Sequence, residues 1–266
     1  MQPDRRIIFY LPLTIALVTV SVLYLAIVLE WMGASTGRGA MFCEFSDGLI
    51  KQPVNTYSNI GFVLAGLFIG WSQAHARFSN NYNALTNRRF VSAFYATLAV
   101  LIGPGSMAMH ATMTDVGGFL DMLSMYLIAS FVFSYALTRF FNIKNIGFVI
   151  TFSLSLIILL YVNSLEDVVV PFVGFIGSLF FGIFLVAAAI IELLHHFIKK
   201  SNVDIKFGIA TILVMGAAVF VWKISHTDGI WCSPDSLLQG HGLWHLLCAL
   251  AVYLLYRFYV SEHIES

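Results

Sequence analysis

Long apolar runs recur from one end of the chain to the other, and they limit the possible folds more than any other feature. A transmembrane helix needs roughly 20 mostly apolar residues. Only 11% of the 266 residues are charged, whereas a soluble domain has about 25%. We therefore predict an all-α polytopic membrane bundle forming a single membrane domain over residues 1–266. The predicted spans are about 7–29, 56–75, 90–110, 119–139, 146–163, 171–196, 207–225 and 240–260.

The distribution of basic residues gives these helices an orientation. If the N-terminus lies inside, the inner segments hold eleven of the fourteen Lys and Arg residues. The outer segments hold Arg38 and Lys51, and Lys223 lies near the outer end of 207–225. An excess of positive charge marks the cytoplasmic side of a membrane protein. We therefore expect a multi-pass protein with both termini in the cytoplasm.

Five polar or ionisable residues lie within otherwise apolar sequence at the outer ends of the predicted spans: Ser106, His110, Asp121, His241 and His245. Such groups are costly at membrane depth, and their presence there indicates a function. Ser106 and His110 are four residues apart, so they share one helix face, and the same holds for His241 and His245. Ser106 taken alone is also typical of a helix serine that bonds back to the i−4 carbonyl.

The three histidines predict a zinc site. A histidine pair four residues apart on a helix offers two imidazoles to one ion. A catalytic zinc takes three protein ligands and keeps a fourth position for water, so His110 would complete the set with His241 and His245. A short Gly-Gly turn at 117–118 would fold the following helix back, so that the Asp121 carboxylate reaches the water.

The predicted outer loops hold further candidates. Cys43 and Cys232 both lie there, and an oxidising compartment favours a disulfide between them. Two free thiols are the alternative, because a sequence does not show that two cysteines meet. Glu44 and His226 are candidates for supporting the metal ligands from these loops. Near the inner side, other ionisable groups are interpreted as interfacial or hydrogen-bonded without a catalytic role: His75, His195, His196, His263 and Glu192.

The order and spacing of the polar residues resemble those of a known family. Ser106-x3-His110-x10-Asp121, followed by His241-x3-His245, is similar to the pattern of the alkaline ceramidases. These belong to a wider superfamily of transmembrane hydrolases and related receptors, including the progestin and adiponectin receptors. The resemblance implies that the three histidines bind zinc and that the serine and the aspartate assist at the metal-bound water.

The likeness extends beyond these five residues. The stretches 42–44 (FCE) and 52–59 (QPVNTYSN) resemble the N-terminal region of the family, so the ceramidase-like core covers about residues 42–260. The family core has seven helices, and residues 1–35 therefore look like an additional N-terminal helix.

The outer loop departs from the family in one respect. Eukaryotic members carry a calcium site of several acidic and amide side chains in the region that matches 41–52. Here only Glu44 clearly matches, and Met41 and Gln52 stand where carboxylates are expected. Calcium takes six to eight oxygen ligands, so we do not predict that the calcium site of these members is conserved here.

The resemblance implies zinc-dependent hydrolysis of the amide bond of a ceramide-like N-acyl lipid to a fatty acid and a free amine. Asp121 would act as general base, and Ser106 would donate a hydrogen bond to the developing oxyanion. We expect a lipid amide as substrate, an active site on the exoplasmic (periplasmic or luminal) side and no nucleic-acid partner. The alternative is a receptor or scaffold of the same superfamily with a structural zinc. A transporter is less favoured. Broken helices and paired charges at mid-membrane are typical of transporters, whereas the ionisable groups here are predicted to lie at one face of the membrane.

Overall fold

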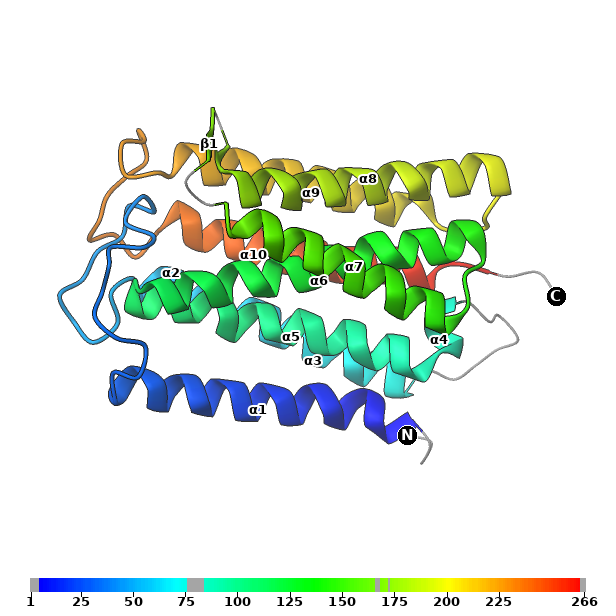
Figure 1. The fold of residues 1–266 in the computed structure, drawn as a ribbon, viewed down its shortest axis with the longest axis horizontal. Helices are drawn as coiled ribbons and strands as arrows, with labels where there is room; N and C mark the ends of the chain where they lie inside the picture. Colours follow the sequence, from blue (N-terminus) through cyan, green and yellow to red (C-terminus); the bar gives the residue numbers. More distant parts are fainter. Residues whose placement is uncertain (1–4, 76–83, 166–167, 172, 264–266) are drawn as a thin grey trace. The chain divides into compact units, whose positions relative to one another are not determined.

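The computed structural model describes residues 5–75, 84–165, 168–171 and 173–263 (Figure 1). Its described part is helical except for turns, loops and one short hairpin. The chain divides into two compact units, Met1–Asp121 with Asp204–Glu262, and Met122–Val203 with His263–Ser266. Helix α6 (Asp115–Phe141) begins in the first unit and continues into the second.

The first unit is built around α5 (Arg89–Thr112), most of whose residues are buried. Its other elements are α1 (Arg6–Val28), α2 (Pro53–Ser58), α3 (Ile60–His75), α4 (Ala84–Asn87), the first turns of α6, α9 (Ile205–Ile224) and α10 (Gly240–Val260). Helices α1 and α3 pack on α5, and α10 packs on α3 and α9. Gly66 allows α3 to approach α5 closely, because a Cβ there would lie 2.7 Å from the Ala96 carbonyl oxygen. Small residues permit such approaches between membrane helices.

The second unit holds the rest of α6, α7 (Asn145–Asn163) and α8 (Ile176–Lys199), with the hairpin of β1 (Val169–Val170) and β2 (Gly174–Phe175) before α8. Its core is a cluster of Tyr126, Ala129 and Leu159, on which side chains of α8 pack. Glu192, expected from the sequence to be interfacial, is instead buried and forms an ion pair with Arg139. A buried charge requires such a partner.

Seven of the described helices are long and apolar enough to cross a membrane: α1, α5, α6, α7, α8, α9 and α10. The predicted span 56–75 differs, because it consists of two helices, α2 and α3, with a break at Asn59. The predicted span 171–196 also begins late, at Ile176, since the hairpin precedes it. The prediction of an all-α polytopic membrane bundle is confirmed.

The turn predicted at Gly117 and Gly118 is wrong. Both glycines lie inside α6, and the chain reverses at Met113, whose left-handed conformation (φ 53°) ends α5. The glycines serve close packing instead: a Cβ on Gly117 would lie 2.7 Å from the carbonyl oxygen of Ala108 on α5. The two-residue connection between α5 and α6 and the close packing at Gly117 therefore bring the first turns of α6, with Asp121, back beside α5.

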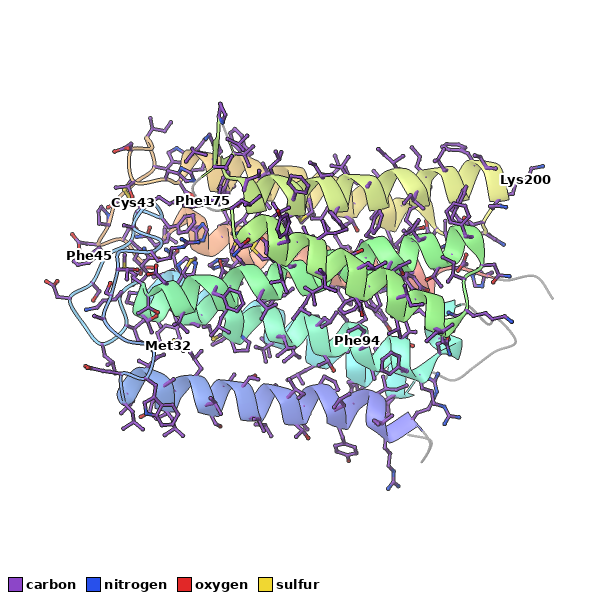
Figure 2. All side chains as sticks on the ribbon, in the orientation of Figure 1. Met32, Cys43, Phe45, Phe94, Phe175 and Lys200 are labelled. Carbon is purple, nitrogen blue, oxygen red and sulfur yellow. A yellow bond between two sulfur atoms is a disulfide. The ribbon has the colours of Figure 1, made fainter. Side chains whose placement is uncertain are left out.

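Three outer segments of the first unit meet at one end of its helices. Thr36 donates its backbone N–H to the Met113 carbonyl oxygen at 3.0 Å, and Thr227 donates to that of Met41 at 2.9 Å. Figure 2 shows Met32, Cys43 and Phe45 at this end, while Phe94 lies near the opposite end of α5. The loops around the predicted site thus collect on one face, as the sequence predicts for the first unit.

Candidate metal centre

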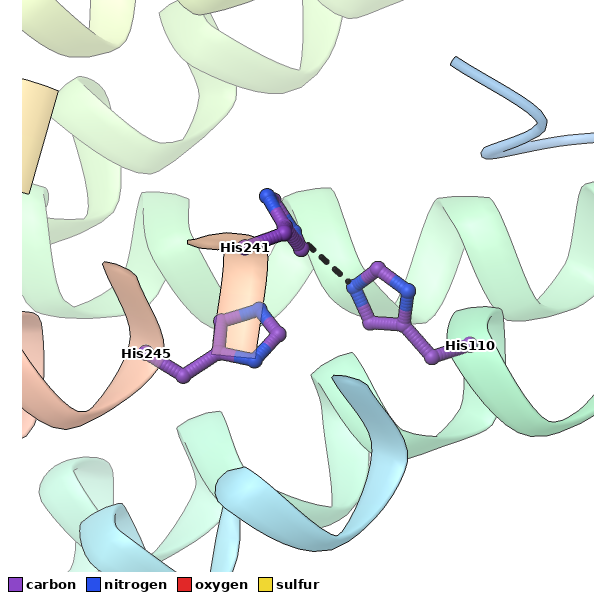
Figure 3. Close-up of side chains that lie close together, drawn as sticks. All are labelled: His110, His241 and His245. Carbon is purple, nitrogen blue, oxygen red and sulfur yellow. Dashed lines mark hydrogen bonds between the residues drawn. The ribbon is translucent and has the colours of Figure 1, made fainter. Parts of the chain in front are cut away.

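Three buried histidines converge where α5 and α10 approach each other (Figure 3). His110 lies in the last turn of α5, and His241 and His245 lie in the first turns of α10. One ligand nitrogen of each ring lies within 4.8 Å of the other two. The Nε2 atoms of His110 and His241 are 3.2 Å apart. The sequence predicted that His110 would complete the pair on α10, and the structure brings the three side chains together.

The tautomer of His110 is fixed by Gln52. The Gln52 amide nitrogen donates to the Gly39 carbonyl oxygen at 2.9 Å, which turns the amide oxygen toward the ring. That oxygen lies 2.5 Å from Nδ1 of His110. An amide oxygen only accepts, so Nδ1 carries the proton. The Nε2 atom of His110 therefore presents a lone pair toward the other two histidines.

The ring of His245 is held at the break between α2 and α3. The Ser58 hydroxyl lies 2.8 Å from Nδ1 of His245 and donates to the Asn55 carbonyl oxygen at 3.0 Å. The Asn59 amide nitrogen lies 3.2 Å from the same ring nitrogen and donates to the Asn55 carbonyl oxygen at 2.8 Å. Nδ1 is therefore the nitrogen that these side chains engage, and Nε2 of His245 is the one that remains for a metal ion.

His241 is oriented by an aromatic contact. Its ring stacks on Phe42, with centroids 3.8 Å apart and planes inclined by 20°. The ring is buried, and its Nδ1 atom makes no hydrogen bond within the described residues. Phe42 belongs to the loop before α2, so this loop contacts the ligands of both α5 and α10.

The geometry fits a divalent metal ion. Two nitrogens bound at about 2.0–2.1 Å to a tetrahedral zinc lie about 3.3 Å apart, close to the observed 3.2 Å between His110 and His241. Metal-ligating histidines usually donate their other ring N–H to a neighbouring acceptor, as His110 does to Gln52. Imidazole sets of this kind suit zinc, copper, iron and nickel. The three histidines are therefore close enough to hold a metal ion.

A polar group lies next to the histidines on α5 and α6. Ser106, one turn before His110, is buried and hydrogen-bonds to the carboxylate of Asp121. The Arg38 guanidinium interacts electrostatically with the same carboxylate. Asp121 is itself half-buried. Residues four apart on a helix are about 5–6 Å apart, so Ser106 lies one turn from His110 and holds the Asp121 carboxylate on that side of α5.

Glu44 contacts the backbone of α2. Its two carboxylate oxygens accept the N–H groups of Val54 and Asn55 at 2.7 and 2.8 Å, where a helix N-terminus favours a negative charge. Burial raises the pKa of Glu44, and the two backbone hydrogen bonds oppose this rise. Glu44 therefore supports the metal ligands through α2, which carries Ser58, and not by a hydrogen bond to a histidine among the described residues.

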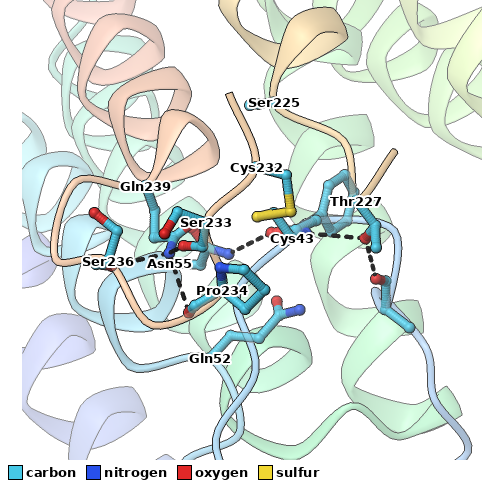
Figure 4. The surroundings of a disulfide bond; sticks show 12 residues. Cys43, Gln52, Asn55, Ser225, Thr227, Cys232, Ser233, Pro234, Ser236 and Gln239 are labelled. Carbon is cyan, nitrogen blue, oxygen red and sulfur yellow. Dashed lines mark hydrogen bonds between the residues drawn. A yellow bond between two sulfur atoms is a disulfide. The ribbon is translucent and has the colours of Figure 1, made fainter. Parts of the chain in front are cut away.

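The disulfide between Cys43 and Cys232 is present, with Cα atoms 5.5 Å apart (Figure 4). The Thr227 hydroxyl donates to the Ala40 carbonyl oxygen at 2.7 Å and accepts the backbone N–H of Cys43 at 3.2 Å. On the other side of the bridge, the Gln239 amide donates to the carbonyl oxygens of Ser233, Pro234 and Ser236. These bonds tie the loop before α2 to the loop that leads into His241.

His226 lies beside this centre. Its ring is 6.1 Å from Phe42 and 4.8 Å from Trp222, centroid to centroid. Burial and the nearby Lys223 ammonium lower the pKa of His226. It is not among the three residues whose ligand atoms come together.

Sequence reasoning missed the residues that orient the histidines. Gln52 and the pair Ser58 and Asn59 lie in the stretch that resembles the family, but nothing in the spacing linked them to particular rings. Arg38 was noted only as a basic residue of an outer loop. Loop residues have no helical periodicity, so their partners emerge only from the folded chain.

A comparison with protein families finds a match. The sequence model of the family described as Ceramidase matches residues 47–265 of this chain. A search of curated proteins with this chain finds no match. The match begins after α1 and after the first half of the loop that follows it, and it includes all three histidines, Ser106 and Asp121.

Proposed function

The chain belongs to the ceramidase family, and we propose that it is a zinc-dependent membrane hydrolase that cleaves the amide bond of a ceramide-like N-acyl lipid. The products would be a fatty acid and a free amine. The observation that carries the proposal is the set of three buried imidazoles, His110, His241 and His245, with the hydrogen-bonded pair of Ser106 and Asp121 one turn away. This set unites a metal site with a carboxylate for proton transfer.

The three histidines would hold the zinc ion through Nε2. Zinc on three imidazoles supplies, when bound, a water molecule that ionises near neutral pH and a Lewis acid without redox chemistry. Gln52 keeps the proton of His110 on Nδ1, and Ser58 engages Nδ1 of His245. The burial of the rings keeps bulk water away and strengthens every charge interaction at the site.

Asp121 would take the proton of the attacking water and return it to the leaving amine. In the structure the Ser106 hydroxyl is engaged with this carboxylate. Once Asp121 is protonated it becomes a donor and can bond to the Ser106 oxygen. The Ser106 proton is then free to turn to the developing oxyanion, a contact whose removal elsewhere costs about 3–4 kcal/mol. The pair would thus serve both proton transfer and charge stabilisation.

The test is the metal content of the purified protein, followed by incubation with a panel of N-acyl lipids and product identification by mass spectrometry. We expect stoichiometric zinc and release of a fatty acid and an amine from ceramide-like lipids. His110→Ala, His241→Ala and His245→Ala should each lose the zinc, whereas Asp121→Ala should keep zinc and lose turnover. Zinc without product from any lipid would favour a receptor or scaffold of the superfamily instead.

We further propose that both termini lie in the cytoplasm and that the site faces the exoplasmic side. The excess of basic residues in the inner segments supports this orientation, as does the disulfide between Cys43 and Cys232, since disulfides persist in oxidising compartments. A membrane-impermeant thiol reagent applied to intact cells tests it with cysteines introduced at Asp47 and Lys144. Labelling at Lys144 but not at Asp47 would reverse the orientation.

A further inference from the structure

A segment outside the family match reaches the site. Residues 35–39 precede the matched region 47–265, and they follow α1, which the sequence analysis identifies as an addition to the family core. Yet Arg38 of this segment interacts electrostatically with the Asp121 carboxylate, and the Gly39 carbonyl oxygen accepts a hydrogen bond from the Gln52 amide. The inference that follows rests on the proposed function.

The segment is fixed to the turn between α5 and α6. The backbone N–H groups of Thr36 and Arg38 both donate to the Met113 carbonyl oxygen, at 3.0 and 3.1 Å. The Thr36 hydroxyl donates to the Asp115 carboxylate at 3.0 Å. Gly37, with φ of +80°, adopts a left-handed conformation that glycine adopts without strain. Arg38 is therefore held at the end of α5 by backbone contacts that do not depend on its side chain.

The side chain of Arg38 lies across α6 at Gly118. A Cβ atom on Gly118 would come within 2.7 Å of Cγ and 2.8 Å of Nε of Arg38. Gly118 precedes Asp121 by three residues, so the two share one face of α6. Because Gly118 has no side chain, the Arg38 side chain can lie against this face of α6, the face that also carries Asp121.

We propose that Arg38 is a positioning residue of the active site, which holds the Asp121 carboxylate in the orientation needed for proton transfer. Ser106 hydrogen-bonds to the carboxylate from α5, and the positive charge of Arg38 acts on it from the segment 35–39. A charge-assisted hydrogen bond is roughly twice as strong as a neutral one, and the planar guanidinium also fixes direction. The N-terminal segment, although outside the family match, would then be required for full turnover.

Removing the guanidinium should lower kcat and leave zinc binding intact. Misplacing a reacting group by about 1 Å can cost on the order of 100-fold, so we expect Arg38→Ala to lose about 10- to 100-fold in kcat with KM unchanged. Arg38→Lys should recover part of this loss, because lysine keeps the positive charge but lacks the planar guanidinium with its fixed hydrogen-bond donors. Arg6→Ala is the matched control, because Arg6 is an exposed arginine in the first turn of α1, more than a helix length from the segment 35–39 in the sequence.

A second variant, at Gly118, tests the placement of the Arg38 side chain without changing any charge. Gly118→Ala places a Cβ against Arg38 and should reproduce most of the loss in kcat. In the Arg38→Ala background the obstructed atoms are gone, so adding Gly118→Ala should cost nothing further. Gly216→Ala is the control, since a Cβ at this helical glycine meets no atom within 4 Å. Additive losses, or wild-type kcat in Gly118→Ala, would overturn the proposal.

A measurement independent of turnover completes the test. The apolar reagent dicyclohexylcarbodiimide should modify Asp121 faster in Arg38→Ala than in the wild type, as followed by peptide mass spectrometry. If Arg38→Ala shows the same labelling of Asp121 as the wild type and the wild-type kcat, the proposed role of Arg38 is wrong and the hydrolase proposal is unaffected. If the zinc-loaded wild-type protein cleaves no lipid, the proposed hydrolase function is wrong. The labelling of Asp121 then still shows whether Arg38 holds this carboxylate.

Discussion

Substitution of Gln52 by alanine perturbs the metal centre without touching a ligand. The Gln52 amide oxygen is the acceptor for Nδ1–H of His110 at 2.5 Å, and both side chains are fully buried. In Gln52→Ala the ring N–H loses its partner in a place where little water can replace it. The ring also loses the contact that directs its Nε2 lone pair toward His241.

Two independent estimates give the magnitude. A buried donor left without an acceptor costs about 1–3 kcal/mol. In Gln52→Ala this cost destabilises the His110 tautomer with the proton on Nδ1, which is the tautomer whose Nε2 atom can bind the metal. Loss of a hydrogen-bond partner of a metal-ligating histidine typically weakens metal binding by about 10- to 100-fold, which corresponds to about 1.4–2.7 kcal/mol. The two ranges overlap, so we expect the Kd for zinc to rise about 10- to 100-fold.

The assay is competition for zinc between the purified protein and a chelator of known affinity at constant pH. Gln73→Ala is the matched control, because Gln73 is an equally buried glutamine whose amide donates to Tyr256, away from the histidines. We expect Gln73→Ala to lower thermal stability but to keep the wild-type Kd. If Gln52→Ala binds zinc as tightly as the wild type, the tautomer argument for His110 is wrong.

Three further predictions concern the loops. Replacing Cys43 and Cys232 together by serine should lower the free energy of unfolding by about 2–4 kcal/mol, measured by thermal unfolding in detergent with the reduced wild type as comparison. Glu44→Gln should cost about 0.5–2 kcal/mol in the same assay, because one of the two acceptor oxygens becomes a donor, whereas Asp47→Asn on the exposed part of the loop should cost nothing. The lowered pKa of His226 means that the unfolded chain binds its proton more readily. Stability should therefore fall as the pH drops below about 6.5, and a His226→Phe variant should show a smaller fall in Tm between pH 7 and pH 5.

The helices and the metal ligands follow from local sequence. Apolar runs of membrane length and a four-residue histidine spacing are properties of single helices, so they can be predicted without knowing the fold. His110 joined the set only because the alternation of spans placed it at the same end as His241 and His245. The structure confirms that convergence, which lies within 4.8 Å.

The errors have a common physical origin. Gly117 and Gly118 predicted a turn, because glycine is frequent in turns. Their role is instead steric, since a Cβ on either would collide with α5 or with Arg38. The break at Asn59 was also not predicted, because the stretch 56–75 was interpreted as one apolar helix. Tertiary contacts decide these points, and a single sequence contains no signal for them.

The placement of Asp121 bears on whether the metal would be catalytic or structural. A structural zinc site closes its coordination with a fourth protein ligand, whereas a catalytic one keeps a position for water. Among the described residues, the candidate ligand set consists of three histidines. The carboxylate that could have been a fourth ligand is engaged by Ser106 and Arg38. A carboxylate held in this way is placed to accept a proton beside the metal, which favours an enzyme over a scaffold. The same reasoning explains why Arg38→Ala should lower kcat without removing zinc, because a carboxylate that is less firmly held spends less time in the orientation that accepts the proton.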